Sequence, residues 1–290
     1  MDNMIKNRFI LGIGSQRAGS TLLHHLLSKS SDIFMHPVKE LHFFDTLYGY
    51  REKSALKDFS TRQVFNDVDR ILSANNFDFI GLKFKNRLRT NKIFSSYDIE
   101  KIDYYDLFRP YLSKKYLLGE VTPEYMLLNE EHIIRMKAVI GEDAGIILLC
   151  RNPFDRLRSA LKLMNVYNNL NMDATVANDW LRYQILNETQ WIKCQDLYND
   201  YERAIRLYSK HFRFFIALSY EQLINSPLVT ANLISEKLNI KIENEIFARL
   251  STKKINSLSD EFFLNPETMA IVEARYSQYN LFFREFFKVE

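Results

Sequence analysis

The sequence predicts an α/β fold in which a central parallel sheet of about five strands lies between two layers of helices. Two observations carry this prediction. Short apolar runs that stop at a turn residue or a charged residue alternate with segments of helical pattern, and the runs show no clean alternation of polar and apolar residues. Strands of a parallel sheet are covered on both faces, so they are apolar throughout. The pattern therefore predicts a three-layer α/β/α architecture, whose ligands bind at the carboxyl ends of the strands.

The elements follow one another along the chain. The predicted strands are Arg8–Gly14, Phe77–Phe84, Tyr116–Val121, Gly145–Cys150 and Arg213–Leu218. The predicted helices are Ser20–Ser30, Glu130–Ile140, Pro153–Val166, Asp173–His211 as one helix or two, and two that begin at Ser226–Pro227 and Asn265–Pro266. Asn129 can cap the second of these helices and Gly141 can end it, while proline at the first helical position marks later starts.

The length of 290 residues suits one large α/β domain. The sequence contains no repeat, no low-complexity tract and no linker rich in Gly, Ser or Pro. We therefore expect a single domain over residues 1–290. Two polar, aromatic-rich segments near residues 45–70 and 85–115 are expected to be insertions that act as lids or bind a ligand.

Net charge and cysteine content exclude several functional classes. The chain has 39 Lys and Arg against 36 Asp and Glu, and the net charge of +3 is too small to indicate a nucleic acid or an anionic membrane as partner. Cys150 and Cys194 are too few for a disulfide framework or a cysteine zinc site. No apolar run approaches the roughly 18 residues of a membrane span, and no signal peptide is recognisable. We expect a soluble, cytoplasmic protein.

The first candidate site is a turn between strand and helix with the sequence Gly14-Ser15-Gln16-Arg17-Ala18-Gly19-Ser20-Thr21. Its glycine spacing is that of a nucleotide-binding P-loop, with Ser20 in place of the lysine. Backbone N–H groups and the helix N-terminus attract an anion there, and Arg17 adds a cation. Because the lysine and a clear acidic Mg²⁺ ligand are missing, the turn is poorly suited to ATP hydrolysis. The alternative is a glycine turn that only connects the two elements.

The second candidate site follows the strand Gly145–Cys150. Arg151 stands at the carboxyl end of this strand, and the helix that begins at Pro153 can carry Ser159 back over the same crevice. A guanidinium and a hydroxyl at that spacing can bind a phosphate. The alternative is a solvated helix face, which suits Arg158 better, and a structural Asp155–Arg156 pair. Two anion sites at neighbouring strand ends indicate a ligand that is phosphorylated at two positions.

With these two sites the chain resembles sulfotransferases that use 3′-phosphoadenosine 5′-phosphosulfate (PAPS), and its motif pattern is most similar to that of glycan-type and bacterial members. Arg17-Ala18-Gly19-Ser20-Thr21 is similar to their 5′-phosphosulfate loop, and Arg151 with Ser159 to their 3′-phosphate pair. Three further segments extend the resemblance in order along the chain: Lys39-Glu40-Leu41-His42-Phe43-Phe44-Asp45 to Lys-Glu-x-His-Phe-Phe, residues 119–125 to Glu-Lys-x-Pro-x-Tyr, and residues 219–227 to a late Tyr-Glu-x-Leu element.

The resemblance implies roles for individual residues. Glu40 would be the catalytic base, and Arg17 would stabilise the leaving 3′,5′-bisphosphate (PAP). His42 would orient Glu40 or the acceptor, or would be a structural histidine, and His36 is the second choice of base. No metal is implied. The residues expected to bind the donor are Arg17, Ala18, Gly19, Ser20, Thr21, Leu22, Arg151, Ser159, Lys253 and Lys254, the last two from a basic loop over the nucleotide.

The sequence differs from the family pattern at two positions, and two alternative functions remain. Arg17 replaces the more usual lysine, and Val121 stands where glycan-type enzymes often have an active-site lysine, for which Lys83 or Lys85 is a candidate substitute. The rivals are a degenerate P-loop kinase, disfavoured by the absent loop lysine, and a non-catalytic PAP-binding protein, disfavoured by Glu40. The carboxylate base favours a sugar or other aliphatic alcohol as acceptor, which the two insertions would bind. A phenol, a lipid and a natural-product alcohol are the alternatives.

Overall fold

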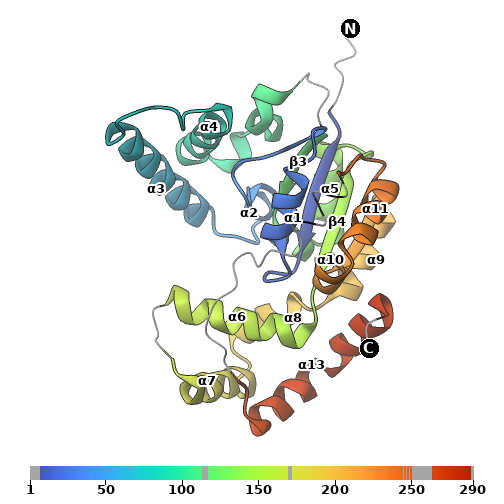
Figure 1. Ribbon diagram of the computed structural model, residues 1–290. Coiled ribbons are helices and arrows are strands. Elements are labelled where there is room, and N and C mark those ends of the chain that lie inside the picture. The colour runs from blue at the N-terminus through green and yellow to red at the C-terminus, as the bar shows by residue number, and fades with distance from the viewer. Residues whose placement is uncertain are drawn as a thin grey trace.

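The structure, a computed structural model, describes residues 7–112, 117–168, 172–243, 245, 247, 249 and 263–288. Its centre is a sheet of five parallel strands in the order β2-β3-β1-β4-β5 (Figure 1). The strands are β1 (Phe9–Gly14), β2 (Ile33–Met35), β3 (Leu117–Val121), β4 (Gly145–Cys150) and β5 (Phe214–Ser219). Helices cover both faces of this sheet, which confirms the predicted three-layer α/β/α fold.

The helices are α1 (Ser20–Leu27), α2 (Phe43–Leu47), α3 (Lys53–Leu72), α4 (Leu82–Ser96), α5 (Glu130–Ile140), α6 (Pro153–Tyr167), α7 (Ala174–Leu186), α8 (Gln190–Leu197), α9 (Tyr201–His211), α10 (Tyr220–Asn225), α11 (Pro227–Leu238) and α13 (Pro266–Phe287). Short 3₁₀ helices are η1 (Ile99–Lys101), η2 (Tyr104–Tyr111) and η3 (Pro123–Leu127). No helix in this described part of the chain combines the length and the apolar character that crossing a membrane requires.

Two hydrophobic cores lie on opposite faces of the sheet, because successive strand residues point to opposite sides. Phe9, Leu11 and Ile13 of β1 join the core that includes side chains of α2, α5 and α9. Ile10 joins the second core, which α1 and α11 cover. The central strand β1 lies between β3 and β4, so two crossovers in opposite directions meet at its carboxyl end. Such a switch point is where open α/β sheets bind ligands.

Two groups of helices lie outside these layers. Helices α6, α7, α8 and α13 share a third core below the carboxyl ends of the strands (Figure 1). Helices α3 and α4 pack on each other and lie beside the sheet, at the upper left of Figure 1. Together with η1 and η2 they span most of the two predicted insertions.

One predicted strand is wrong and one strand was missed. The segment Phe77–Phe84 forms a turn and the start of α4, with Gly81 as the cap residue. Phe79 packs on the Phe84 ring at 5.2 Å and lies under the Arg70 guanidinium, so its apolar residues cover a helix pair rather than a sheet. The missed strand β2 has only three residues, too few for a periodic pattern.

The segment predicted as one helix or two, Asp173–His211, contains three helices. Breaks fall at residues 187–189 and 198–200. Glu188 has φ +48° at the first break, and Asp200 caps α9 at the second by accepting a hydrogen bond from the Arg203 N–H. Short polar residues that favour caps interrupt an otherwise helical pattern at both places.

The predicted capping signals are present at α5, α6 and α13, whereas the Ser226 side chain makes no capping hydrogen bond before α11, although Pro227 does begin this helix. The Asn129 side chain accepts the His132 N–H at the start of α5, and Gly141 ends this helix with φ +92°. Pro153 and Pro266 stand at the starts of α6 and α13, where the preceding asparagine side chains accept first-turn N–H groups. The cap before α6 matters most for function, because this helix begins at the carboxyl end of β4.

Candidate active site

The turn after β1 packs tightly against β4. Ser15 N donates a hydrogen bond to Leu149 O at 3.0 Å. Gly14 has φ +142°, and a Cβ atom there would lie 2.2 Å from Leu149 O, so only glycine fits. Gly19, with φ +93°, caps α1 and offers no side chain to the first-turn N–H groups of that helix. Those N–H groups, together with the positive end of the helix dipole, form an anion-binding position.

The structure brings the two predicted anion sites together. Arg17 Nε donates to Ser159 Oγ of α6 at 2.9 Å. Arg151 Nη1 donates to Arg17 O at 2.9 Å, and its guanidinium lies over the Tyr220 ring at 4.9 Å. Arg151 Nε is buried and has no hydrogen-bond partner among the described residues. A buried donor without a partner is costly, so this one points to an anionic ligand.

Glu40 lies on a loop that is fixed to the carboxyl end of β3. Its N–H donates to Val121 O at 3.1 Å, so the loop runs beside the last residue of β3. Glu40 and His42 have φ values of +63° and +50°, a strained conformation for residues with side chains. The Glu40 carboxylate forms ion pairs with Lys39 and, at 3.7 Å, with His42 Nε2.

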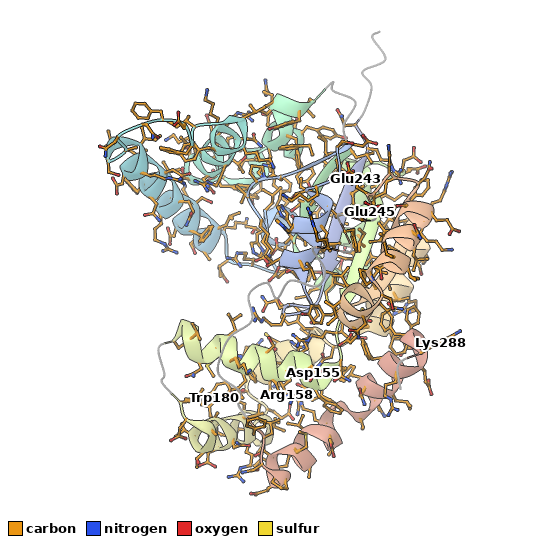
Figure 2. All side chains as sticks on the ribbon, in the orientation of Figure 1. Asp155, Arg158, Trp180, Glu243, Glu245 and Lys288 are labelled. Atoms are coloured by element: carbon orange, nitrogen blue, oxygen red, sulfur yellow. The ribbon has the colours of Figure 1, made fainter. Side chains whose placement is uncertain are left out.

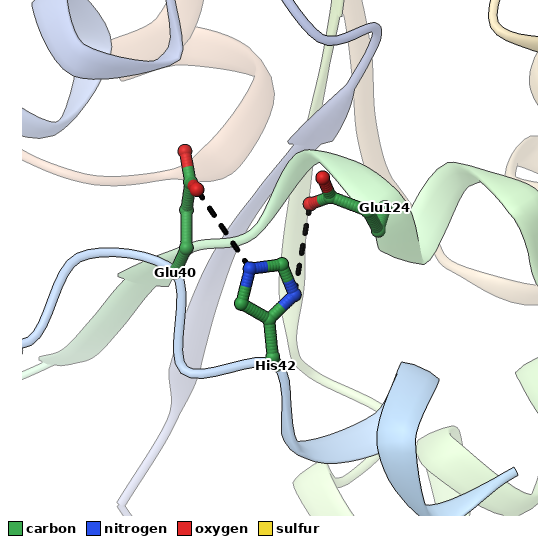
Figure 3. A group of neighbouring side chains, drawn as sticks. All are labelled: Glu40, His42 and Glu124. Atoms are coloured by element: carbon green, nitrogen blue, oxygen red, sulfur yellow. Dashed lines mark ion pairs between the residues drawn. The ribbon is translucent and has the colours of Figure 1, made fainter. Parts of the chain in front are cut away.

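His42 lies among three carboxylates. Its Nδ1 is 2.7 Å from Asp45 Oδ2 and 3.8 Å from Glu124 Oε2, while its Nε2 faces Glu40 (Figure 3). Burial favours the neutral ring, but the carboxylates of Asp45, Glu40 and Glu124 outweigh it and raise the pKa of His42 to about 9. The structure thus places His42 where it can orient Glu40, one of the two alternatives that the sequence left open.

The cations beside Glu40 dominate its protonation. Burial alone raises the pKa of this carboxyl group, but the hydrogen bond from His42 and the charge of Lys39 lower it to about 2. Glu40 is therefore ionised at neutral pH and is a weak base in the ligand-free chain.

Glu40, His42 and Glu124 offer ligand atoms that all lie within 4.8 Å of one another, which is close enough for a metal ion. In the ligand-free chain these side chains form a cluster of ion pairs, with His42 held between Glu40 and the carboxylates of Asp45 and Glu124.

Gln16 and Glu124 connect the anion sites to the base, and sequence reasoning missed both. Gln16 Nε2 donates to Glu124 Oε1 at 2.5 Å, and the other carboxylate oxygen faces His42. Burial raises the pKa of Glu124, although the charge of His42 opposes this shift. Both residues stand within motifs that the sequence singled out, and that position was the one signal available for them.

A third missed residue, Glu120 of β3, supports the loop from below. It is fully buried and accepts hydrogen bonds from Tyr104 at 2.5 Å, Thr122 at 2.8 Å and Tyr125 at 3.1 Å. Burial, against those hydrogen bonds, raises the pKa of Glu120 to about 7. The Tyr125 hydroxyl also accepts the Phe43 N–H at 3.0 Å, so this network fixes the start of α2 directly after His42.

Other predicted residues lie elsewhere. His36 is fully buried with Nε2 3.1 Å from Thr90 Oγ1, and burial lowers its pKa to about 4, so it is enclosed by the core rather than open to an acceptor. Lys83 and Lys85 are exposed on α4. Lys253 and Lys254 lie outside the described residues.

The proposed Asp155–Arg156 pair is wrong. Asp155 instead pairs with Arg158 one helical turn later, and Figure 2 shows these two side chains near each other on α6. Arg156 is fully buried, where its guanidinium donates to Asn199 Oδ1 at 2.7 Å and Gln195 Oε1 at 2.9 Å. Adjacent residues on a helix point in directions about 100° apart, so the two side chains face different surroundings.

These features define a three-layer α/β protein with a glycine turn and a helix N-terminus at its topological switch point. A family model described as "Sulfotransferase family" matches residues 9–244, so the chain belongs to the sulfotransferase family. No curated protein sequence gave a significant match.

Solved structures of sulfotransferases resemble this chain in fold. The enzyme from Alicyclobacillus acidocaldarius matches with a TM-score of 0.57 and 15% identity over 99% of this chain and 98% of that one. A sulfotransferase domain from the curacin biosynthetic pathway matches with a TM-score of 0.49 and 16% identity over 93% of this chain and 98% of that one. Sulfotransferase STF9 from Mycobacterium avium matches with a TM-score of 0.47 and 16% identity over 98% of this chain and 78% of that one. At such identities the likeness to the first of these shows a shared fold and no more.

Proposed function

We propose that the chain transfers the sulfuryl group of PAPS to a hydroxyl acceptor and that Glu40 is the general base. One observation carries the proposal: an unbroken series of contacts leads from the two anion sites to the base. Arg17 contacts Ser159, and its neighbour Gln16 contacts Glu124. Glu124 in turn faces His42, which faces Glu40. Membership of the sulfotransferase family supports the same reading.

The donor would lie with its two anionic ends on the two sites. Arg151 and Ser159 would bind the 3′-phosphate, and the unpaired Arg151 Nε supplies a donor for it. Arg17 and the N–H groups of residues 19–22 would bind the 5′-phosphosulfate at the start of α1. Charge-assisted hydrogen bonds of this kind are roughly twice as strong as neutral ones.

The reaction requires one proton transfer and one substitution at sulfur. Glu40 takes the proton of the acceptor hydroxyl, and the acceptor oxygen forms a bond to sulfur. The bond between sulfur and the 5′-phosphate oxygen breaks, and its electron pair leaves with PAP. Arg17 and the first-turn N–H groups of α1 stabilise the charge that develops on this phosphate.

Calorimetry with PAP and with ATP·Mg²⁺ tests the donor class. We expect micromolar or tighter binding of PAP and weak or no binding of ATP·Mg²⁺. In the Arg151→Ala variant, PAP affinity should fall by at least about tenfold because a charge-assisted contact is lost. Arg158→Ala is the matched control, since this arginine pairs with Asp155 on the same helix. Absence of PAP binding by the wild type would refute the proposal.

For the acceptor we propose a sugar or another aliphatic alcohol, because the segment around Glu40 resembles that of glycan-type sulfotransferases, in which the base is a carboxylate. The α3–α4 pair, whose helix α3 packs against α2 just after the loop of Glu40, would contribute to its binding. Incubation of radiolabelled PAPS with an extract of the source cells, followed by identification of the labelled product, tests both points. Label found only on phenols would contradict the acceptor class.

A further inference from the structure

Both oxygens of the proposed base face a cation. Lys39 Nζ pairs with Glu40 Oε1, and His42 Nε2 lies 3.7 Å from Glu40 Oε2. An acceptor hydroxyl can be deprotonated by this carboxylate only if its basicity rises, because the two cations hold the pKa of Glu40 at about 2. Either one of them leaves, or the base stays weak.

The two cations differ in how firmly they are held. His42 is 10% exposed, and Asp45 and Glu124 hold its other ring nitrogen, so the ring is fixed from both sides. The Lys39 side chain is 25% exposed, and its ammonium group forms an ion pair with Glu40. A lysine side chain carries a compact charge on a stem of four flexible carbons, so it can turn at low cost. Lys39 is the cation that can move.

The ammonium group of Lys39 is also close to the donor side of the site. Glu40, the residue after Lys39, donates its N–H to Val121 O, and Val121 pairs with Gly12 of β1, two residues before the turn that begins at Gly14. An acceptor oxygen in contact with Glu40 and in line with sulfur places the sulfuryl group about 6 Å from the carboxylate. A lysine that pivots about its stem spans such a distance.

We propose that Lys39 moves from Glu40 to the sulfuryl group when PAPS binds, so that one side chain both holds the transferred group and releases the base. The inference rests on the proposed function. Lys39 keeps its proton throughout, the acceptor proton goes to Glu40, and the electron pair of the broken sulfur–oxygen bond leaves with PAP. The sulfuryl group, rather than the nucleotide, is then the signal that prepares Glu40 for catalysis.

PAP lacks the sulfuryl group, so a comparison of PAPS with PAP isolates the contact of Lys39. Glu40→Gln is the suitable background, because it blocks turnover and removes the carboxylate that competes for the lysine. In this background the additional change Lys39→Met should weaken PAPS binding by at least about tenfold and leave PAP binding within about twofold. Lys83→Met in the same background tests the competing lysine and should change neither affinity.

Each outcome of the calorimetry decides one point. Equal PAPS affinity with and without Lys39, while PAP still binds, would overturn this inference and leave the proposed function intact. Loss of PAPS affinity in the Lys83→Met variant instead would assign the sulfuryl contact to Lys83 and would also overturn the inference about Lys39. Failure of the wild type to bind PAP would refute the proposed function itself.

Transfer rates give a second, independent measurement. In the wild-type background Lys39→Met should lower the transfer of label from PAPS by at least about tenfold, because the sulfuryl contact is lost. Lys39→Arg keeps the charge and should restore a large part of that rate. A Lys39→Met variant with normal circular dichroism, normal PAP affinity and the full transfer rate would contradict the proposal.

Discussion

Replacement of His42 by glutamine should destabilise the protein in a way that depends on pH. The imidazolium is 10% exposed and lies among Asp45, Glu40 and Glu124, so the folded state holds its proton more tightly than the unfolded chain does. Glutamine keeps a hydrogen-bond donor near Asp45 but carries no charge. The variant therefore loses only the part of the stability that depends on this proton.

The size and direction of the effect follow from the pKa of His42, which is about 9 in the folded protein and about 6.5 in an unfolded chain. A difference of this size corresponds to ~3 kcal/mol. Because the folded-state pKa of His42 is the higher one, the stabilisation is fully present below about pH 6.5. It is lost progressively as the pH rises through about 9.

Urea unfolding followed by the fluorescence of Trp180 and Trp191 measures this dependence between pH 6 and 10. The free-energy difference between wild type and His42→Gln should be largest at pH 6 and should shrink by ~3 kcal/mol at pH 10. Titration of lysines and tyrosines affects both proteins and cancels in the difference. A difference that stays constant over this range would refute the assignment of His42 as a buried imidazolium.

His36 provides a control of opposite sign. Burial lowers its pKa to about 4, so the folded state disfavours its proton. The free-energy difference between wild type and His36→Gln should therefore fall as the pH drops from 7 towards 4, and it should stay constant at alkaline pH. The two histidines together separate a local electrostatic cause from a general effect of pH.

Three further substitutions test other parts of the site and its support. Glu40→Gln should lower the transfer of label from PAPS by about 10²- to 10⁴-fold and leave PAP affinity unchanged in calorimetry; near-normal transfer would eliminate Glu40 as the base. Gly19→Ala should weaken PAP binding by at least about tenfold, because φ is +93° there and the new Cβ would lie 2.7 Å from the Tyr220 ring; unchanged affinity would exclude the turn as the anion site. Arg156→Met should lower the free energy of unfolding by about 2 kcal/mol or more, since buried amide partners lose their hydrogen bonds; a stability equal to wild type in urea would contradict this.

Most of the sheet could be predicted because its strands are apolar and β1 and β4 are buried at every residue. The strands β1, β3, β4 and β5 were placed within one residue at each end, since an apolar run between turn residues is typical of a strand covered on both faces. The same signal failed at Phe77, which is 60% exposed next to a helix pair. A run of apolar residues does not indicate whether it will form a strand or pack against helices, because this depends on the tertiary fold.

Residues of the candidate site also differ in whether a local sequence pattern indicates them. Arg17, Arg151 and Ser159 could be found because each stands in a local motif whose spacing has a chemical meaning. Gln16 and Glu124 escaped because their hydrogen bond joins residues 108 positions apart, and no local pattern indicates such a contact. The carboxylates that hold the charge of His42 include its chain neighbours Glu40 and Asp45 as well as the distant Glu124, and only the fold shows that all three lie around the ring.

The small net charge of +3 conceals two regions of opposite charge in one site. Guanidinium groups of Arg17 and Arg151 lie on the donor side, and carboxylates of Glu40, Asp45 and Glu124 surround His42 on the other. A donor with several negative charges is attracted to the first region and repelled by the second, so its sulfuryl end can face the base only at the boundary between them. A cation at that boundary has to exchange partners when the donor arrives, which is the change that comparing PAPS with PAP binding detects.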